Sequence, residues 1–122
     1  MSRVAKHRNE ETAPLREQRC EACEGGIPAL SPTGITALKS ALDEGWRVVD
    51  GKVLTRRFGF RNFAEALAFT NKVGALAEEQ GHHPDIALGW GKVEITLYTH
   101  AVNALTRNDF ILAAQIDAQL EN

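Results

Sequence analysis

Three of the four histidines of this chain, His82, His83 and His100, lie in one part of the sequence. An imidazole ring has an unperturbed pKa of about 6.5, so both its neutral and cationic forms are accessible near neutral pH. Imidazoles beside a carboxylate can protonate a leaving hydroxyl and remove a proton elsewhere on the same substrate. Glu78 stands one helical turn before His82,, and Trp90 offers a flat apolar wall for a planar ligand. These residue types indicate acid/base chemistry.

The strands next to these histidines determine how close together the rings come. Alternating apolar residues predict a hairpin with a two-residue turn at Gly91-Lys92,. That register puts His83 across from His100, and facing residues have Cβ atoms about 4.5–5.5 Å apart. A one-residue change in loop length puts His82 there instead. We therefore expect the imidazoles to meet at the open end of this hairpin.

Two metal-binding hypotheses compete with acid/base chemistry. Glu78 and the histidines are ligand types for zinc or non-haem iron, but adjacent histidines followed by Pro84 cannot easily aim at one ion. Cys20-x-x-Cys23 is half of a zinc site that no second pair completes, and it lacks the βαβ context of a thioredoxin-like motif,. We therefore predict no metal, and two reduced cysteines without a catalytic role.

Hydrophobic periodicity, helix caps and turn residues predict three helices and four strands. In chain order they are a helix from Ser31-Pro32 to Gly45, strands at 46–49 and 53–60 joined by Asp50-Gly51, a helix from Asn62 to Gly81, strands at 85–90 and 93–98, and a helix beginning at Thr106,. Two hairpins separated by a helix are typical of a single α+β domain, α-ββ-α-ββ-α. Its four-stranded antiparallel sheet has helices packed on one face.

The last helix carries more apolar residues than one face needs. Ile111 and Leu112 lie partly outside the stripe that can face the sheet,. They are either a self-association surface or two singly exposed aliphatic residues. Asp109 has a structural role in the same helix, because it completes a capping box with Thr106.

Length and charge limit the class of protein. The 122 residues suit one domain, and 14 basic against 16 acidic side chains give a net charge of −2. This balance argues against a dedicated nucleic-acid binder, which carries a basic excess. No apolar run approaches the roughly 20 residues of a membrane span, and the charged N-terminus lacks the apolar core of a secretory signal. We expect a cytoplasmic protein with a poorly ordered polar tail at 1–24 and a folded domain at 25–122.

The chemistry-bearing residues together resemble the motif of a known family, the pterin-4a-carbinolamine dehydratases. The matching residues are Glu78-x-x-x-His82-His83-Pro84, five residues, Trp90, nine residues, His100, eight residues and Asp109. The similarity covers roughly residues 28–120. Such a set of spacings is far more specific than a single short motif.

This resemblance implies a function and a set of roles. Family members are hydro-lyases that dehydrate 4a-hydroxytetrahydrobiopterin to quinonoid dihydrobiopterin, which recycles the pterin cofactor of aromatic amino acid hydroxylases. They form dimers or tetramers and use no metal or bound cofactor. Carried over, His82 and His83 are the acid/base pair and His100 binds substrate and assists. The supporting residues are Glu78, Pro84, Trp90 and Asp109.

A second hypothesis is a non-catalytic binding protein on the same scaffold. Some relatives act as dimerisation cofactors for a homeodomain transcription factor, and others as assembly factors for a carbon-fixing enzyme. Fold alone does not decide between these functions. Retention of all three histidines favours the enzyme, because a scaffold has no need of an imidazole cluster.

Overall fold

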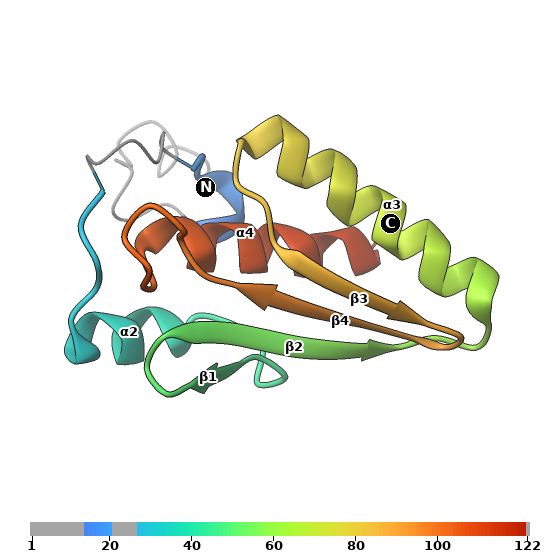
Figure 1. The fold of residues 1–122 in the computed structure, drawn as a ribbon, viewed down its shortest axis with the longest axis horizontal. Helices are drawn as coiled ribbons and strands as arrows, with labels where there is room; N and C mark the ends of the chain where they lie inside the picture. The colour runs from blue at the N-terminus through green and yellow to red at the C-terminus, as the bar shows by residue number, and fades with distance from the viewer. Residues whose placement is uncertain (1–13, 21–26, 122) are drawn as a thin grey trace, which may run out of the picture.

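The computed structural model describes residues 14–20 and 27–121 and has the predicted α+β architecture (Figure 1). The elements of these residues are η1 (Leu15–Glu17), α2 (Pro32–Lys39), β1 (Arg47–Val49), β2 (Val53–Gly59), α3 (Phe63–Gln80), β3 (Asp85–Gly89), β4 (Lys92–Leu97), α4 (Arg107–Ala118) and η2 (Gln119–Glu121). The order α-ββ-α-ββ-α is therefore confirmed. Among the described helices, none combines the length and apolar character that crossing a membrane requires.

The four strands form one antiparallel sheet in the order β1-β2-β4-β3. Alternate side chains of the two central strands are buried in the core; they are Leu54, Phe58, Val93, Ile95 and Leu97. Helix α3 packs against β3, β4 and α4 (Figure 1). The opposite face carries polar residues such as Arg57, which is exposed and pairs across strands with Glu94. The sheet thus has the one buried face that its alternating sequence predicted.

Local capping signals fix the ends of α3 as predicted. The Asn62 side chain accepts a hydrogen bond from the Glu65 backbone N–H at 2.9 Å. At the other end Gly81 adopts a left-handed conformation with φ 67°, which glycine adopts without steric cost,. The Asp50-Gly51 turn is also confirmed, because both residues have positive φ,. These ends matter because Gly81 directly precedes His82.

The predicted turn of the second hairpin is wrong by one residue. The turn is formed by Trp90 and Gly91, and Gly89 pairs with Lys92. A Cβ on Gly91 would lie 2.9 Å from the carbonyl oxygen of Phe60, whose N–H donates to the Gly91 carbonyl at 2.7 Å. Gly91 therefore allows a close approach between distant parts of the chain, and the strand register shifts accordingly.

The first helix is shorter than predicted. Helix α2 ends at Lys39, and a turn follows in which the Leu42 N–H donates to the Lys39 carbonyl at 3.0 Å. Gly45, the predicted helix end, has another role. A Cβ there would lie 2.6 Å from Nε of Arg56, so the glycine makes room for that side chain.

Residues 14–20, which we call the N-terminal strap, pack on α4. Leu15 is buried in the core. The Gln115 side chain donates to the Gln18 carbonyl at 2.7 Å, and Arg107 donates to the Gln18 side chain at 3.0 Å. The prediction of a poorly ordered tail is therefore wrong for the strap. Residues 1–13 and 21–26, including Cys23, lie outside the described residues.

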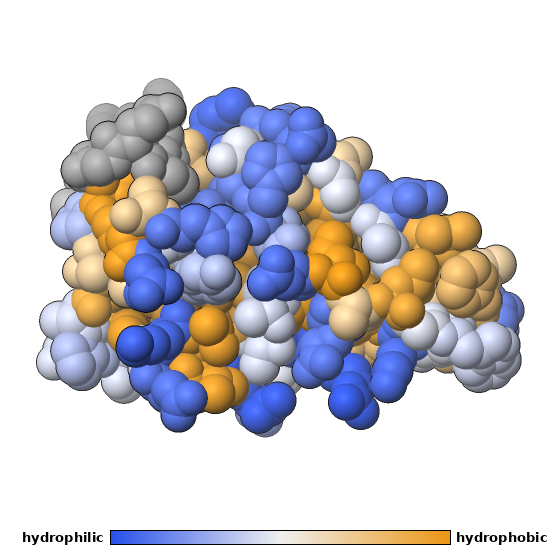
Figure 2. All heavy atoms as spheres, in the orientation of Figure 1, coloured by the Kyte–Doolittle hydropathy of each residue, from blue (hydrophilic) through white to orange (hydrophobic). Residues whose placement is uncertain are grey.

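The strap changes the interpretation of the apolar residues on α4. Ile111 and Leu112 are 2% and 0% exposed and belong to the same core cluster as Leu15. Both alternatives for these residues, a self-association surface and two singly exposed aliphatic side chains, are wrong, because both residues are buried within the chain. Exposed apolar side chains occur instead on α3, at Phe63 and Leu67. Figure 2 shows apolar atoms gathered at the end of the molecule where α3 begins and the β3-β4 hairpin turns.

Trp46 is a core residue, as predicted, and is 1% exposed. Its indole N–H donates to the Asp117 carboxylate at 2.9 Å, and Arg56 donates to the same carboxylate at 2.9 Å. Burial raises the pKa of Asp117 above its ordinary value, while the Trp46 hydrogen bond and the Arg56 charge oppose that shift,. This carboxylate ties α4 to the first hairpin.

Candidate active site

A buried ion-pair geometry joins His82 to Asp109. His82 follows the left-handed Gly81, and its backbone N–H donates to the Ala77 carbonyl at 3.2 Å, which caps α3. Its side chain is 5% exposed and that of Asp109 is fully buried. The His82 Nε2 and Asp109 Oδ1 atoms are 2.6 Å apart. The end of one helix and the start of another therefore bring an imidazole and a carboxylate together inside the protein.

The other oxygen of Asp109 has two further hydrogen-bond donors. The Thr106 backbone N–H donates to Asp109 Oδ2 at 2.9 Å, which confirms the predicted capping box. The Thr99 hydroxyl donates to the same oxygen at 2.9 Å, and the Thr99 and Thr106 hydroxyls are 2.7 Å apart. All three residues are buried. The carboxylate is thus held from three directions.

His83 forms a second pair, which faces solvent. Its Nε2 atom is 2.6 Å from Glu78 Oε2. The two side chains are 58% and 78% exposed. Pro84 follows and leads into β3, which keeps the chain extended at His83,. Adjacent histidines therefore point to different environments, each with its own carboxylate.

His100 lies in the loop that follows β4, at the same end of the hairpin as the other two histidines. Its side chain is exposed, and its ring meets the ring of Tyr98 edge-on with centroids 4.4 Å apart. Thr99, between them, points inward to Asp109. This alternation places His100 and Tyr98 on the outward side of the strand.

Two sequence predictions about the site need correction. The observed register pairs Asp85 with Thr96, so its continuation brings His83 level with Tyr98, and the predicted direct pair with His100 is wrong. Trp90 is at the hairpin turn and is 69% exposed. Six residues of extended strand lead from Pro84 to Trp90, which puts Trp90 roughly 20 Å from the end of the hairpin where the histidines lie. Within one chain, Trp90 therefore cannot be a wall beside these histidines.

Sequence reasoning missed Thr99 and Tyr98 as members of this site. Thr99 is two residues after the buried Leu97, so its side chain points to the same face of the strand, which could have indicated a buried hydroxyl facing the last helix,. Tyr98 and His100 are likewise two residues apart and point to the opposite face. What the sequence does not give is the partner of each side chain, because Asp109 and Thr99 meet only after α4 packs.

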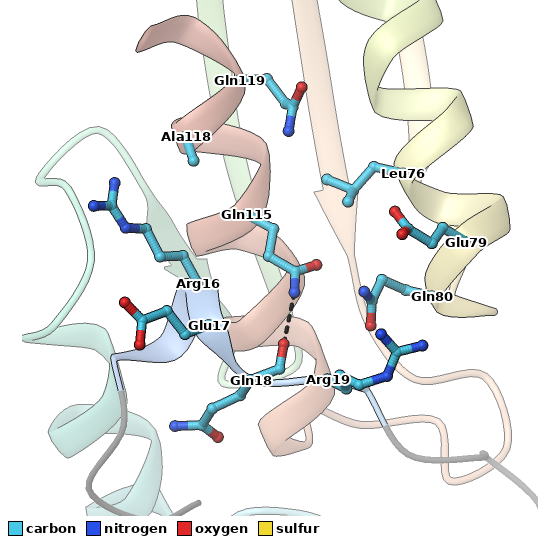
Figure 3. Close-up of a pocket in the computed structure, with 10 residues that line it drawn as sticks. All are labelled: Arg16, Glu17, Gln18, Arg19, Leu76, Glu79, Gln80, Gln115, Ala118 and Gln119. Carbon is cyan, nitrogen blue, oxygen red and sulfur yellow. Dashed lines mark hydrogen bonds between the residues drawn. The ribbon is translucent and has the colours of Figure 1, made fainter. Parts of the chain in front are cut away.

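Neither a metal site nor the cavity of Figure 3 coincides with these histidines. In the part of the chain that the structure describes, no three His, Cys, Asp or Glu side chains are placed to hold a metal ion. The cavity has a volume of about 510 Å³ and lies between the N-terminal strap, α3 and α4 (Figure 3). Its lining includes Glu79, Gln80 and Gln115 but none of the predicted site residues.

Comparison with known proteins gives a consistent result. The family described as pterin 4 alpha carbinolamine dehydratase matches residues 28–119. A relative from Rubrobacter xylanophilus, provisionally named a pterin-4-alpha-carbinolamine dehydratase, is 52% identical over 103 residues, which cover 84% of this chain and 95% of the relative. A relative of the same name from Alkaliphilus metalliredigens is 49% identical over 105 residues, covering 86% and 95% of the two chains.

Two solved structures are also similar. A transcriptional coactivator/pterin dehydratase from Brucella melitensis superposes with a TM-score of 0.70 at 33% identity, covering 75% of this chain and 97% of its own. A pterin dehydratase-like protein identified as a RuBisCO assembly factor in the α-carboxysome superposes with a TM-score of 0.53 at 34% identity, covering 62% and 88%.

Proposed function

This chain belongs to the pterin 4 alpha carbinolamine dehydratase family, and we propose on that basis that it is a hydro-lyase acting on 4a-hydroxytetrahydrobiopterin. The products are quinonoid dihydrobiopterin and water. The observation that carries the proposal is the presence of two imidazole–carboxylate pairs on adjacent residues, one buried and one exposed. The proposed physiological role is recycling of the pterin cofactor of aromatic amino acid hydroxylases.

The two pairs suit the two proton movements of this dehydration. The bond between C4a and the hydroxyl oxygen breaks once that oxygen is protonated, and a ring nitrogen of the pterin loses a proton. His83 is exposed to solvent and has Glu78 beside it, so it is placed to move a proton to or from a bound substrate,. His82 is held by Asp109, whose Oδ1 atom lies 2.6 Å from its Nε2 atom and fixes the orientation of the ring,. His100 extends the same end of the hairpin as a substrate-binding group.

The direct test is dehydration of 4a-hydroxytetrahydropterin by the purified protein. We expect wild type to accelerate the reaction above buffer, and His83→Ala to lower kcat/KM about a hundredfold, as loss of a general acid/base does. His7→Ala is the matched control, because His7 is the only histidine outside the family match. Chelation before the assay should leave the rate unchanged. A folded wild-type protein that matches the buffer rate refutes the proposal.

The alternative, a non-catalytic binding protein, has one specific observation in its favour. A structure 34% identical to this chain is described as an assembly factor for RuBisCO. The same assay separates the two functions. A binding protein should leave the dehydration rate at the buffer value, both as wild type and as His83→Ala. If wild type is folded but inactive and His83→Ala is equally stable, the alternative is supported.

We also propose that the protein works as a homodimer or homotetramer. The exposed Phe63 and Leu67 lie one turn apart on α3, with 45% and 39% of their surfaces accessible. An apolar pair of this kind suits burial between copies of the chain. Light scattering on the eluted protein measures the mass directly, and a monomer at micromolar concentration contradicts this part of the proposal.

A further inference from the structure

We propose that Thr99 is a positioning residue for the dehydration, one that acts on His82 through Asp109. The inference rests on the proposed function, because it assigns a role within the same site. Thr99 is 1% exposed, so it cannot contact substrate directly. Its hydroxyl donates to Asp109 Oδ2 at 2.9 Å. The hydroxyl therefore orients the carboxylate that holds His82.

Counting the available protons shows which group donates and which accepts in the hydrogen bonds among Thr99, Thr106 and Asp109. Thr99 has one hydroxyl proton, and Asp109 accepts it,. The 2.7 Å contact between the Thr99 and Thr106 hydroxyls must then use the proton of Thr106. Two donors therefore converge on Asp109 Oδ2: the Thr99 hydroxyl and the Thr106 backbone N–H. Oδ1 remains for His82, so the carboxylate cannot rotate without losing bonds at both oxygens.

This arrangement also determines which nitrogen of His82 carries the proton that faces Asp109. When the Asp109 carboxylate is ionised it only accepts hydrogen bonds, and the 2.6 Å contact at Oδ1 then uses a proton on His82 Nε2,. Removal of the Thr99 hydroxyl leaves Oδ2 with one donor and lets the carboxylate turn. The Nε2 proton of His82 then loses its fixed partner. The expected result is a slower chemical step with little change in substrate binding.

Thr99 occupies a place in the fold that suits such a role. Its backbone N–H donates to the Ala104 carbonyl at 2.9 Å, and this bridge closes the loop that carries His100. The loop then leads into Thr106 and Asp109 at the start of α4. Thr99 thus connects the loop that carries His100 to Asp109, the carboxylate partner of His82.

Kinetics of four proteins test the proposal: wild type, Thr99→Val, Thr99→Ser and Thr55→Val. We expect Thr99→Val to lower kcat roughly ten- to thirtyfold with KM within about twofold, because one hydrogen bond to a charged group is lost. Thr99→Ser restores the hydroxyl and should keep at least about a third of wild-type kcat. Thr55 is a buried threonine that donates to the Ile95 carbonyl outside the site, so Thr55→Val should stay within about twofold. Thr99→Ala replaces Thr99→Val if the latter lacks a native near-ultraviolet spectrum.

A second measurement separates this proposal from the proposed function. NMR of the imidazole nitrogens reports exchange of the His82 Nε2 proton with water, which we expect to be about tenfold faster in Thr99→Val and unchanged in Thr99→Ser. If wild type has no dehydratase activity, the proposed function fails and this exchange alone decides the role of Thr99. The proposal is overturned by unchanged exchange in Thr99→Val, by its unchanged kcat in an active enzyme, or by equal losses in Thr99→Ser and Thr99→Val.

Discussion

The substitution Asp109→Asn tests whether the charge of this buried side chain orients His82. Asn keeps the shape and one carbonyl oxygen, which can accept from Thr99 and from the Thr106 backbone N–H. Its amide N–H₂ group then faces His82 Nε2, where a carboxylate oxygen lies at 2.6 Å in wild type. Two N–H groups cannot bond to each other, so His82 must move its proton to the other ring nitrogen. We expect kcat to fall at least about a hundredfold, since a comparable change in a serine-protease triad costs about 10⁴.

The same substitution should also destabilise the fold. It removes one charge-assisted hydrogen bond and weakens the two at the other oxygen, which together amount to about 3 kcal/mol. For a domain of this size that corresponds to a fall in the thermal midpoint of roughly 10–20 °C. Calorimetry measures this fall, and it sets a temperature at which the variant is still folded.

The assay is the initial rate of dehydration at that temperature, with Asp117→Asn as the matched control. Asp117 is a second carboxylate on α4, and it accepts from Trp46 and Arg56 away from the histidines. Its replacement changes hydrogen bonding on the same helix but should leave kcat within about twofold. Folded Asp109→Asn with kcat within tenfold of wild type, or an equal loss in Asp117→Asn, refutes the reasoning.

Three further predictions follow from other parts of the molecule. Trp90→Ala should leave kcat/KM within about twofold, because Trp90 is 69% exposed at the far end of the hairpin; a tenfold loss contradicts this placement. Leu15→Ala should lower the free energy of unfolding in urea by about 2 kcal/mol through loss of core packing, whereas a mobile residue would give no change. Burial raises the pKa of Asp117 above its ordinary 3.8, so the folded state binds this proton more tightly than the unfolded state. The resulting contribution to folding stability is complete below pH 3.8 and is lost as pH rises,. The stability of wild type relative to Asp117→Asn should therefore fall as the pH rises above 3.8,; a constant difference contradicts it.

Features that depend on local chemistry were predictable from the sequence. Asn62 and Gly81 bound α3, and Thr106 with Asp109 opens α4, because each motif satisfies backbone groups within a few residues,. The Asp50-Gly51 turn is of the same kind, since its positive φ values are a property of the two residues themselves. The architecture followed from these boundaries and from the alternation along the strands.

Features that depend on distant contacts were not predictable. Gly45 is not the helix end that the sequence predicts, and Gly91 is a turn residue as predicted; each of these glycines also accommodates a remote group. Arg56 lies where a Cβ of Gly45 would be, and the Phe60 carbonyl lies where a Cβ of Gly91 would be. A sequence shows that a glycine is present and does not show which partner requires it. The resulting shift in register separates His83 from the predicted pairing with His100.

The sequence indicated where the histidines lie more than how each is paired, and their roles in a reaction stay predictions. The gathering of three histidines at one end of a hairpin followed from the order of the strands. The division into a buried His82 pair and an exposed His83 pair depends on where Asp109 and Glu78 lie after α3 and α4 pack. The N-terminal strap was missed because Leu15 is a single apolar residue in a polar stretch, without periodicity to reveal it.

The unequal environments of His82 and His83 have a consequence for interpreting divergence among relatives. A buried pair such as His82 with Asp109 helps to hold two helices together, so a descendant that abandons catalysis still has a structural reason to keep it. An exposed pair such as His83 with Glu78 adds little to stability, and mutation can erase it once catalysis is no longer under selection. In a relative that no longer catalyses the reaction, the presence or absence of the residue equivalent to His83 is therefore more informative about function than that of His82.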